Sequence, residues 1–233
     1  MNSHHTLEVT AHIVEQAKAL GASLAGITSI DSLKDSASYK IYGDTEWRAD
    51  EKAVLVFALV HEETEPELDW WDDIQGGSPG NRRLIQIGES LAEWTKEEFN
   101  INARTLPYHV EKGGIFLKDA AALAGLGIIG ANNLLVTPEF GPRIRLRALL
   151  LDSDLAPTGP LDFSPCNECD MPCKKACPQK AFVEGPYKRD SCQIQMDRDV
   201  ADKITFENES RKGSPNVCIQ YCRACELACP IGR

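Results

Sequence analysis

The sequence predicts an α/β (α+β) core followed by a smaller, cysteine-rich module. Segments with the apolar spacing of helices and of strands succeed one another through the first part of the chain, and all nine cysteines lie after Ser164. Because a domain usually has about 100 to 200 residues, we expect a core over residues 1–160 and a second domain over residues 161–233. The second part has few large aliphatic side chains, so a bound metal is expected to hold it together.

The core is expected to begin with a helix and two strands. Residues 6–20 carry apolar side chains three and four positions apart and are followed by Gly21, which predicts an amphipathic helix that ends there. A short buried strand is expected at residues 24–28. The segment KAVLVFALV, residues 52–60, is almost continuously apolar, which is typical of a central strand covered on both faces. Residues 29–50, between the two strands, are polar and irregular.

The rest of the core alternates in the same way. Residues 81–99 have one apolar stripe and predict a second amphipathic helix, followed by a strand at 101–106 and a helix at 115–123. An acidic run, EETEPELDWWDD, precedes them at residues 62–73. It is either a solvated loop or a docking edge for a basic redox partner.

Two further patterns carry chemical information. Arg143, Arg145 and Arg147 alternate with apolar residues, so a strand would place three guanidinium groups on one face, for an anionic ligand or as the charged outer face of an edge strand. Gly125, Gly127 and Gly130 form G-x-G-x-x-G, but they follow a predicted helix and precede a strand. This order is the reverse of a dinucleotide-binding site, so the glycines are expected to allow close approach of a large ligand or another chain segment.

The cysteines form two runs that each end in Cys-Pro, as in a ferredoxin-type module. The first run holds Cys166, Cys169, Cys173 and Cys177, and the second holds Cys222, Cys225 and Cys229. A cubane iron–sulfur cluster takes three thiolates from one run and a fourth from the other, so Cys229 would join the first three thiols of the first run. Cys177, Cys222 and Cys225 would hold a second cluster, for which Cys192 and Cys218 both remain candidates as the fourth ligand.

Zinc sites and disulfides are the alternatives for these thiols. Paired Cys-x-x-Cys spacing also suits tetrahedral zinc, but zinc sites do not require the closing Cys-Pro or the additional cysteines of each run. Disulfides are disfavoured because no signal peptide is apparent and the thiols have ligand spacing, which suits the reducing cytoplasm. We therefore expect two 4Fe-4S clusters.

The run AGLGIIGANNLLVTPEFG, followed by the double Cys-Pro module, resembles the epoxyqueuosine reductase family and, more distantly, the reductive dehalogenases. The segments ALGASLAGIT and KAVLVFALV lie where that family has similar segments, so the resemblance covers nearly the whole chain. It implies a nitroreductase-like α/β core that holds a base-off cobalamin, and a C-terminal ferredoxin-like module whose two 4Fe-4S clusters deliver electrons to the cobalt.

The resemblance also implies roles for particular residues. It assigns Cys192 rather than Cys218 as the isolated ligand, so that Cys218 is spare. One cluster would be held by Cys166, Cys169, Cys173 and Cys229, and the other by Cys177, Cys192, Cys222 and Cys225. The residues that would lie beside the corrinoid are Gly125, Gly127, Gly130, Asn132 and Asn133.

Three departures from the family pattern limit this transfer. The spacing from Cys169 to Cys173 is one residue longer than usual, so the loop must bulge. The family's proton-donating aspartate corresponds to Glu111, which can donate a proton if a pocket raises its pKa but is otherwise an exposed loop residue. The helical-repeat tail of full-length epoxyqueuosine reductases is missing, and the formal charge of -10 disfavours nucleic acid, so a tRNA substrate is not expected.

Two functions of different classes follow from these patterns. The first is a cobalamin-dependent iron–sulfur reductase of a small substrate or of another protein's corrinoid, and the second is a ferredoxin-like electron carrier without corrinoid. Either would take electrons from a donor such as ferredoxin or flavodoxin. No apolar run approaches the roughly 18 residues of a membrane helix, so we expect a cytoplasmic protein with no membrane contact. A homodimer fits the implied core.

Overall fold

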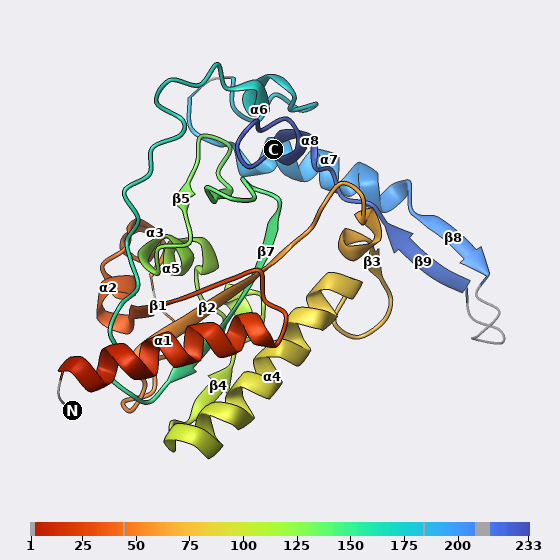
Figure 1. Ribbon diagram of the computed structural model, residues 1–233. Helices are drawn as coiled ribbons and strands as arrows, with labels where there is room; N and C mark the ends of the chain where they lie inside the picture. Colours follow the sequence, from red (N-terminus) through yellow and green to blue (C-terminus); the bar gives the residue numbers. More distant parts are fainter. Residues whose placement is uncertain (1–2, 44, 184, 208–214) are drawn as a thin grey trace.

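The computed structural model describes residues 3–43, 45–183, 185–207 and 215–233. Its centre is an antiparallel four-stranded sheet in the order β1–β2–β7–β4 (Figure 1). The strands are β1 (Leu24–Ser29), β2 (Ala53–Val60), β7 (Ile144–Leu151) and β4 (Ala103–Thr105). Along the β2–β7 pair the register runs from Ala53 opposite Leu151 to Val60 opposite Ile144. The mixed α/β core expected from the sequence is confirmed.

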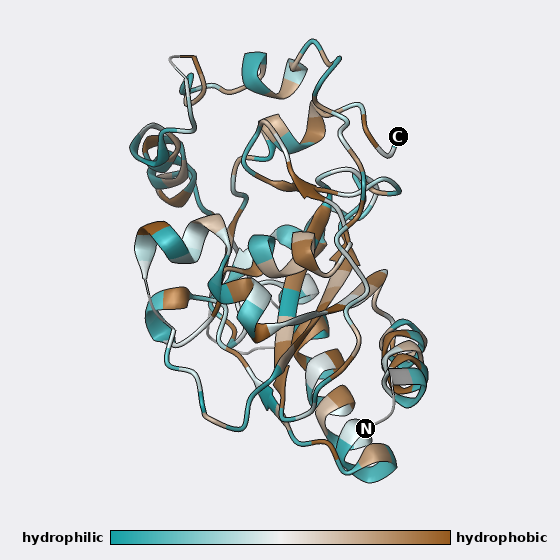
Figure 2. Ribbon diagram, turned by 90° about the vertical axis from the view of Figure 1, so that its left-hand side faces the viewer, coloured by the Kyte–Doolittle hydropathy of each residue, from teal (hydrophilic) through white to brown (hydrophobic). Residues whose placement is uncertain are grey.

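Helices cover both faces of this sheet because the side chains of β2 alternate between two apolar clusters. Val54 and Val56 face α2 (Ile30–Lys34), α3 (Ala37–Tyr42) and α5 (Leu117–Leu123). Leu55 and Phe57 face α1 (Ser3–Ala19) and α4 (Pro79–Phe99). Burying each such side chain contributes about 1.5 to 3 kcal/mol. The prediction of a central strand covered on both faces is confirmed, and Figure 2 shows its apolar strands between helices of mixed polarity.

The longest helix, α4, has the terminal residues that helices favour. The Ser78 hydroxyl accepts a hydrogen bond from the Asn81 amide at 3.3 Å, and Pro79 occupies the first turn. Asn100 ends the helix in the left-handed conformation, with φ of 54°. The helix predicted for residues 81–99 is therefore confirmed, with its start two residues earlier.

The segment expected to be irregular contains the two short helices α2 and α3. Ser29 caps α2 by accepting a hydrogen bond from the Ser32 amide, and Leu33 is fully buried. Helices this short offer too few positions for an apolar period to appear in the sequence. Tyr39 packs into the core, whereas the side chain of Tyr42 remains 75% exposed.

The cysteine-rich part lies beyond one end of the sheet, where β7 begins (Figure 1). It contains α6 (Pro172–Lys175), α7 (Arg189–Ala201), α8 (Ala224–Leu227), β8 (Ile204–Glu207) and β9 (Pro215–Ile219). Strand β9 also pairs with β3 (Trp71–Asp72), so a three-stranded sheet in the order β3–β9–β8 crosses the predicted boundary at residue 160. The division into two domains stays a prediction.

Four short elements complete the described part of the chain. The turns η1 (Pro66–Asp69) and η2 (Val110–Lys112) are 3-10 helices, and β5 (Ile128–Ile129) pairs with β6 (Leu135–Val136). No helix in the described ranges is long and apolar enough to cross a membrane.

Candidate functional site

Four thiols from the two cysteine runs lie close enough to interact around α6 and the end of α8. Burial raises the pKa of Cys173, and the neighbouring thiols of Cys229, Cys166 and Cys169 raise it further. Cys173 and Cys229 are both buried. We call Cys166, Cys169, Cys173 and Cys229 the first thiol group.

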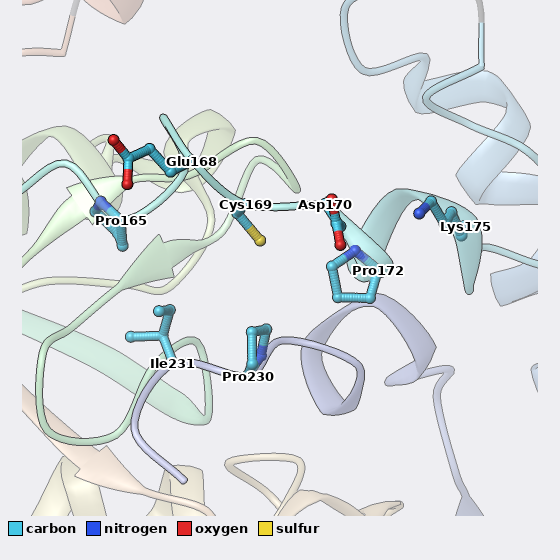
Figure 3. A pocket seen from close by; sticks show the side chains of 8 residues that line it. All are labelled: Pro165, Glu168, Cys169, Asp170, Pro172, Lys175, Pro230 and Ile231. Carbon is cyan, nitrogen blue, oxygen red and sulfur yellow. The ribbon is translucent and has the colours of Figure 1, made fainter.

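A cavity of about 560 Å³ opens beside this group (Figure 3). Cys169 lines it directly, and Pro165, Pro172 and Pro230 line it as the chain neighbours of the other three thiols. In Figure 3 the sulfur of Cys169 points into the space between the two chain segments, whereas the carboxylate of Glu168 points away. The space beside the first thiol group is therefore large enough for an inorganic cluster.

The other thiols gather around α7 and the start of α8. Burial raises the pKa of Cys225 to about 12, with further contributions from Cys222, Cys192 and Cys177. Burial is also the main reason why the pKa of Cys222 is raised, and the neighbouring Cys192 and Cys177 raise it further. We call Cys177, Cys192, Cys222 and Cys225 the second thiol group. Its thiols are less deeply buried than Cys173 and Cys229, and Cys222 is exposed.

Backbone amides point at the sulfurs of both groups. The amides of Ala131 and Met171 donate to the sulfurs of Cys166 and Cys169, each at 3.4 Å. In the second group, the amide of Ala181 donates to Cys177 at 3.3 Å. Such hydrogen bonds stabilise a thiolate, and they are among the features that set the potential of an iron–sulfur cluster.

The raised pKa values have a simple electrostatic meaning. When thiolates gather, each negative charge opposes ionisation of the next, unless a cation is bound among them. A donor set of four soft sulfurs suits iron–sulfur clusters or zinc. In the described part of the chain, no three His, Cys, Asp or Glu side chains converge as around a single metal ion. The two groups are therefore loose arrangements of thiols rather than compact tetrahedra.

Cys218 lies outside both groups. It is buried in β9. Its pKa is raised mainly by this burial and to a smaller extent by the charge of Asp72, and no other thiol contributes. Cys192, in contrast, affects the pKa of both Cys222 and Cys225. The geometry thus agrees with Cys192 as the fourth member of the second group, although the ligand assignment itself stays a prediction.

The predicted glycine run packs against other parts of this chain. A methyl group at Gly127 would lie 2.2 Å from the carbonyl oxygen of Val136. Gly125 has φ of 79° and packs against Gly159. At Gly130 a methyl group would meet the side chain of Val136 at 2.6 Å and the sulfur of Cys166 at 3.5 Å. On these sides the glycines accommodate chain segments, one of the two possibilities that the sequence left open.

The two asparagines join this run to its surroundings. Asn132 is buried, and its amide donates to the carbonyl of Cys225 at 3.4 Å. Asn133 has φ of 57°, and its carbonyl accepts a hydrogen bond from Lys118 Nζ at 2.6 Å. Burial lowers the pKa of Lys118, a residue that sequence analysis did not single out. The run therefore lies between the core helix α5 and both thiol groups.

The three arginines serve neither of the uses expected from the sequence. Strand β7 lies between β2 and β4 rather than at an edge, and the guanidinium groups bind within the protein. Arg143, just before β7, donates to the carbonyls of Cys229, Ile231 and Gly232 at 3.4, 3.0 and 2.5 Å. Arg145 and Arg147 also bind other segments of the chain. The alternation thus marks a strand whose polar side chains attach loops to the sheet.

Arg147 attaches the loop that carries Glu111. Its guanidinium donates to the carbonyl of Leu106 at 3.0 Å and lies 5.6 Å from the ring centre of Tyr108. Glu111 itself is 73% exposed, with His109 Nδ1 3.6 Å from its carboxylate. The structure therefore places Glu111 in solvent, outside a shielding pocket.

A buried charged network connects the core to the second thiol group, and sequence analysis missed it. Asp69 bonds His61 Nδ1 at 2.6 Å, Arg145 at 2.6 Å and Arg223 at 3.0 Å. Glu226 bonds Arg145 at 2.9 Å and also binds Arg223. Burial alone would raise the pKa of Asp69, but His61, Arg145 and Arg223 together lower it. One indication of this network was present in the sequence, because Arg223 and Glu226 lie next to the cysteines in the segment CRACEL.

The fold and the two thiol groups define a mixed α/β protein with a cysteine-rich centre of the kind found in iron–sulfur redox enzymes. No protein-family model matches the chain. Among curated proteins, an epoxyqueuosine reductase of Lactococcus garvieae is 29% identical over 65% of the chain and 40% of its own length. A tetrachloroethene reductive dehalogenase of Sulfurospirillum multivorans is 32% identical over 48% of the chain and 22% of its own length. The chain thus spans less than half of either relative.

Solved structures with the same names share the fold. An epoxyqueuosine reductase bound to an epoxyqueuosine-modified tRNA stem loop superposes with a TM-score of 0.66, at 20% identity, over 97% of this chain and 65% of that one. A Bacillus subtilis epoxyqueuosine reductase, with its catalytic aspartate loop swung out of the active site, gives 0.65 at 19% identity over 97% of this chain and 66% of that one. A reductive dehalogenase described as B12-dependent gives 0.60 at 20% identity, over 79% of this chain and 28% of that one.

The chain is therefore epoxyqueuosine reductase-like, with more distant likeness to reductive dehalogenases. The resemblance noted in the sequence is confirmed.

Proposed function

We propose that the chain is an iron–sulfur oxidoreductase that takes electrons one at a time from a protein donor. The observation that carries this proposal is the division of eight thiols into two groups of four, each with members from both cysteine runs and the second completed by the isolated Cys192. Each group has the ligand number and type of a 4Fe-4S cluster, which supplies one-electron transfer when bound. The names of the similar proteins support the same class of chemistry.

The surroundings of the two groups suggest their order. The first group accepts a hydrogen bond on the sulfur of Cys166 from the Ala131 amide of the glycine-asparagine run, whereas the second group meets this run through the carbonyl of Cys225. The second group contains the exposed Cys222, and α7, which carries Cys192, has no buried residue. The second group is therefore the side at which a small donor such as ferredoxin or flavodoxin docks, and the first group faces the acceptor.

The acceptor is proposed from the likeness to be a base-off cobalamin beside Gly125, Gly127, Gly130, Asn132 and Asn133. The local geometry does not enclose such a group, because the glycines pack against Val136, Gly159 and Thr158. The two cavities described lie elsewhere, beside Cys169 and between α1 and the end of α4. We therefore derive no reaction step through the corrinoid. The same packing favours the second candidate function, an electron carrier without corrinoid.

Glu111 is proposed as the proton donor if the protein is a reductase. Its exposed position requires the loop of η2 to move before a pocket can shield the carboxylate. The swung-out catalytic loop of the Bacillus subtilis protein supports a loop with more than one position. Arg147 holds the base of this loop through Leu106 and Tyr108, so the movement is limited to the residues that follow.

The substrate is proposed to be a small molecule or another protein's corrinoid. A similar structure contains a tRNA stem loop, but this chain carries a formal charge of -10, which opposes phosphate binding. The absence of tRNA binding and the formation of a homodimer both stay predictions.

The decisive experiment is anaerobic reconstitution with iron and sulfide, followed by titration with cob(II)alamin under electron paramagnetic resonance. About eight irons per chain are expected for two cubanes. Failure to assemble iron–sulfur signals, with about one tightly bound zinc per group instead, would refute the oxidoreductase proposal. Loss of the lower-ligand nitrogen splitting of cobalt at one equivalent of protein would support the corrinoid-dependent reductase. An unchanged cobalt spectrum beside intact cluster signals would support the electron carrier.

A further inference from the structure

Arg143, just before β7, and Arg145, within it, carry the same charge but have different partners beside the two thiol groups. Arg143 and Arg145 lie two residues apart, and their guanidinium groups reach different ends of the second cysteine run. Arg143 binds the carbonyl of Cys229, in the first group. Arg145 binds the carboxylate of Glu226, which directly follows Cys225 of the second group. The first group therefore lies beside an arginine that is bound to backbone carbonyls, and the second lies beside an arginine that is paired with carboxylates.

The first group lies beside an unneutralised positive charge. Arg143 is 3% exposed, and its hydrogen bonds go to three backbone carbonyls. Within the described ranges, no carboxylate forms an ion pair with it. The buried guanidinium of Arg143 therefore lies against the chain segment that carries Cys229, a thiol of the first group.

The second group lies beside a network of paired charges, in which Arg223 directly follows Cys222 and Glu226 directly follows Cys225. Asp69 and Glu226 supply two carboxylates, and Arg145 and Arg223 supply two guanidinium groups. The side chain of Glu226 is 6% exposed. Each guanidinium of this network is paired with a carboxylate, unlike that of Arg143.

We infer that these charges give the two clusters unequal reduction potentials, with the cluster at the first group the easier to reduce. The inference rests on the proposed function. A positive charge lowers the energy of an added electron, and a negative charge raises it. The low exposure of Arg143 and Glu226 limits screening by solvent. The transfer moves one electron from the second cluster to the first, leaves the former oxidised and the latter reduced, and moves no proton.

The direction has a functional consequence. The second group carries the exposed Cys222 and meets the glycine-asparagine run through the carbonyl of Cys225, whereas the first group accepts a hydrogen bond from the run on the sulfur of Cys166. Electrons that arrive from a low-potential donor protein at the second group would therefore move to lower energy as they approach the core. The arginine alternation predicted from the sequence then sets the direction of electron flow.

The test is a redox titration of the reconstituted protein followed by electron paramagnetic resonance. The variant Cys192→Ala, which removes a ligand of the second group, identifies the signal of each cluster. In the unmodified protein, the first cluster should have the higher midpoint potential. Arg143→Gln should lower the potential of the first cluster, and Glu226→Gln should raise that of the second. Each change is expected to alter electron affinity about tenfold, which is about 59 mV for a one-electron couple.

Two controls separate charge from structure. Arg143→Lys keeps the charge with fewer hydrogen bonds, so its first-cluster potential should stay near that of the unmodified protein. Glu51→Gln removes a carboxylate that is bonded to Arg104 near the opposite end of the sheet, and should move neither potential. If both Arg143 variants fail to assemble the first cluster, Glu226→Gln decides the test, and an unchanged second potential then overturns the inference.

Other outcomes are equally distinct. Equal or reversed potentials in the unmodified protein, or shifts of the same sign in Arg143→Gln and Glu226→Gln, would overturn this inference alone. Absence of iron–sulfur signals after reconstitution would instead refute the proposed function on which it rests.

Discussion

Replacing Cys192 and Cys218 separately by alanine tests the ligand assignment most directly. Cys192 interacts with Cys222 and Cys225 and is hydrogen-bonded to Tyr187, whereas the titratable neighbour of Cys218 is Asp72. With four irons in each cubane, Cys192→Ala should reduce the iron content from about eight to about four per chain. Cys218→Ala should leave it at about eight.

The two changes also differ in their effect on stability. Cys218 is 2% exposed, so its truncation leaves a small cavity and should cost about 1 kcal/mol in the free energy of unfolding. Cys192 is only half-buried, and its replacement should act mainly through the lost metal. Iron and acid-labile sulfide analysis, with chemical denaturation of the apo and reconstituted forms, measures both effects. Loss of four irons from Cys218→Ala but not from Cys192→Ala would refute the assignment.

Three other changes test separate parts of the structure. Glu111→Gln should lower turnover of a reductase substrate about 100-fold while leaving iron content unchanged, because an amide cannot donate the carboxyl proton; unaltered turnover would remove Glu111 from the chemistry. Gly127→Ala should destabilise the fold by about 2 kcal/mol in urea denaturation, because its methyl group would overlap the Val136 carbonyl, and an equally stable variant would contradict the close packing. The pKa of Asp69 is lowered on folding, so its stabilisation is present above the ordinary value of 3.8 and is lost as the pH falls through the folded-state value. Asp69→Asn should therefore cost about 3 kcal/mol at neutral pH, and this difference should shrink below about pH 3.8; a pH-independent difference would show that the charge is not responsible.

The central strand and the two long helices were predictable because their signals are long. Residues 52–60 have eight apolar side chains in nine positions. Residues 81–99 have a single apolar stripe that extends over about five helical turns. The helices α2 and α3 were missed because five or six residues do not show a period. Their position depends instead on the Ser29 cap and on burial of Leu33 against the sheet.

Seven members of the two thiol groups could be inferred from spacing, because ligand number and loop geometry restrict which cysteines can meet, whereas the choice of Cys192 over Cys218 came from the family resemblance. The partners of the arginines could not. Alternation along β7 indicates a strand with charged positions, but it does not say whether water, a ligand or a buried carboxylate faces them. Asp69 lies 76 positions before Arg145, and Glu226 lies 81 positions after it, so only the tertiary fold brings these charges together.

The same contacts bear on whether residues 161–233 form an independent domain. The carbonyls of Cys229, Ile231 and Gly232 bind Arg143 of the core, and β9 pairs with β3. Among the described residues after 160, only five hydrophobic side chains are buried, and three of them are Cys173, Cys218 and Cys229. Without the core, the buried polar groups of this part would lose their partners, and few apolar side chains would remain to compensate. The cysteine-rich part therefore depends on the end of the sheet as well as on the metal proposed for it, and a fragment that begins at residue 161 should bind iron less tightly than the whole chain.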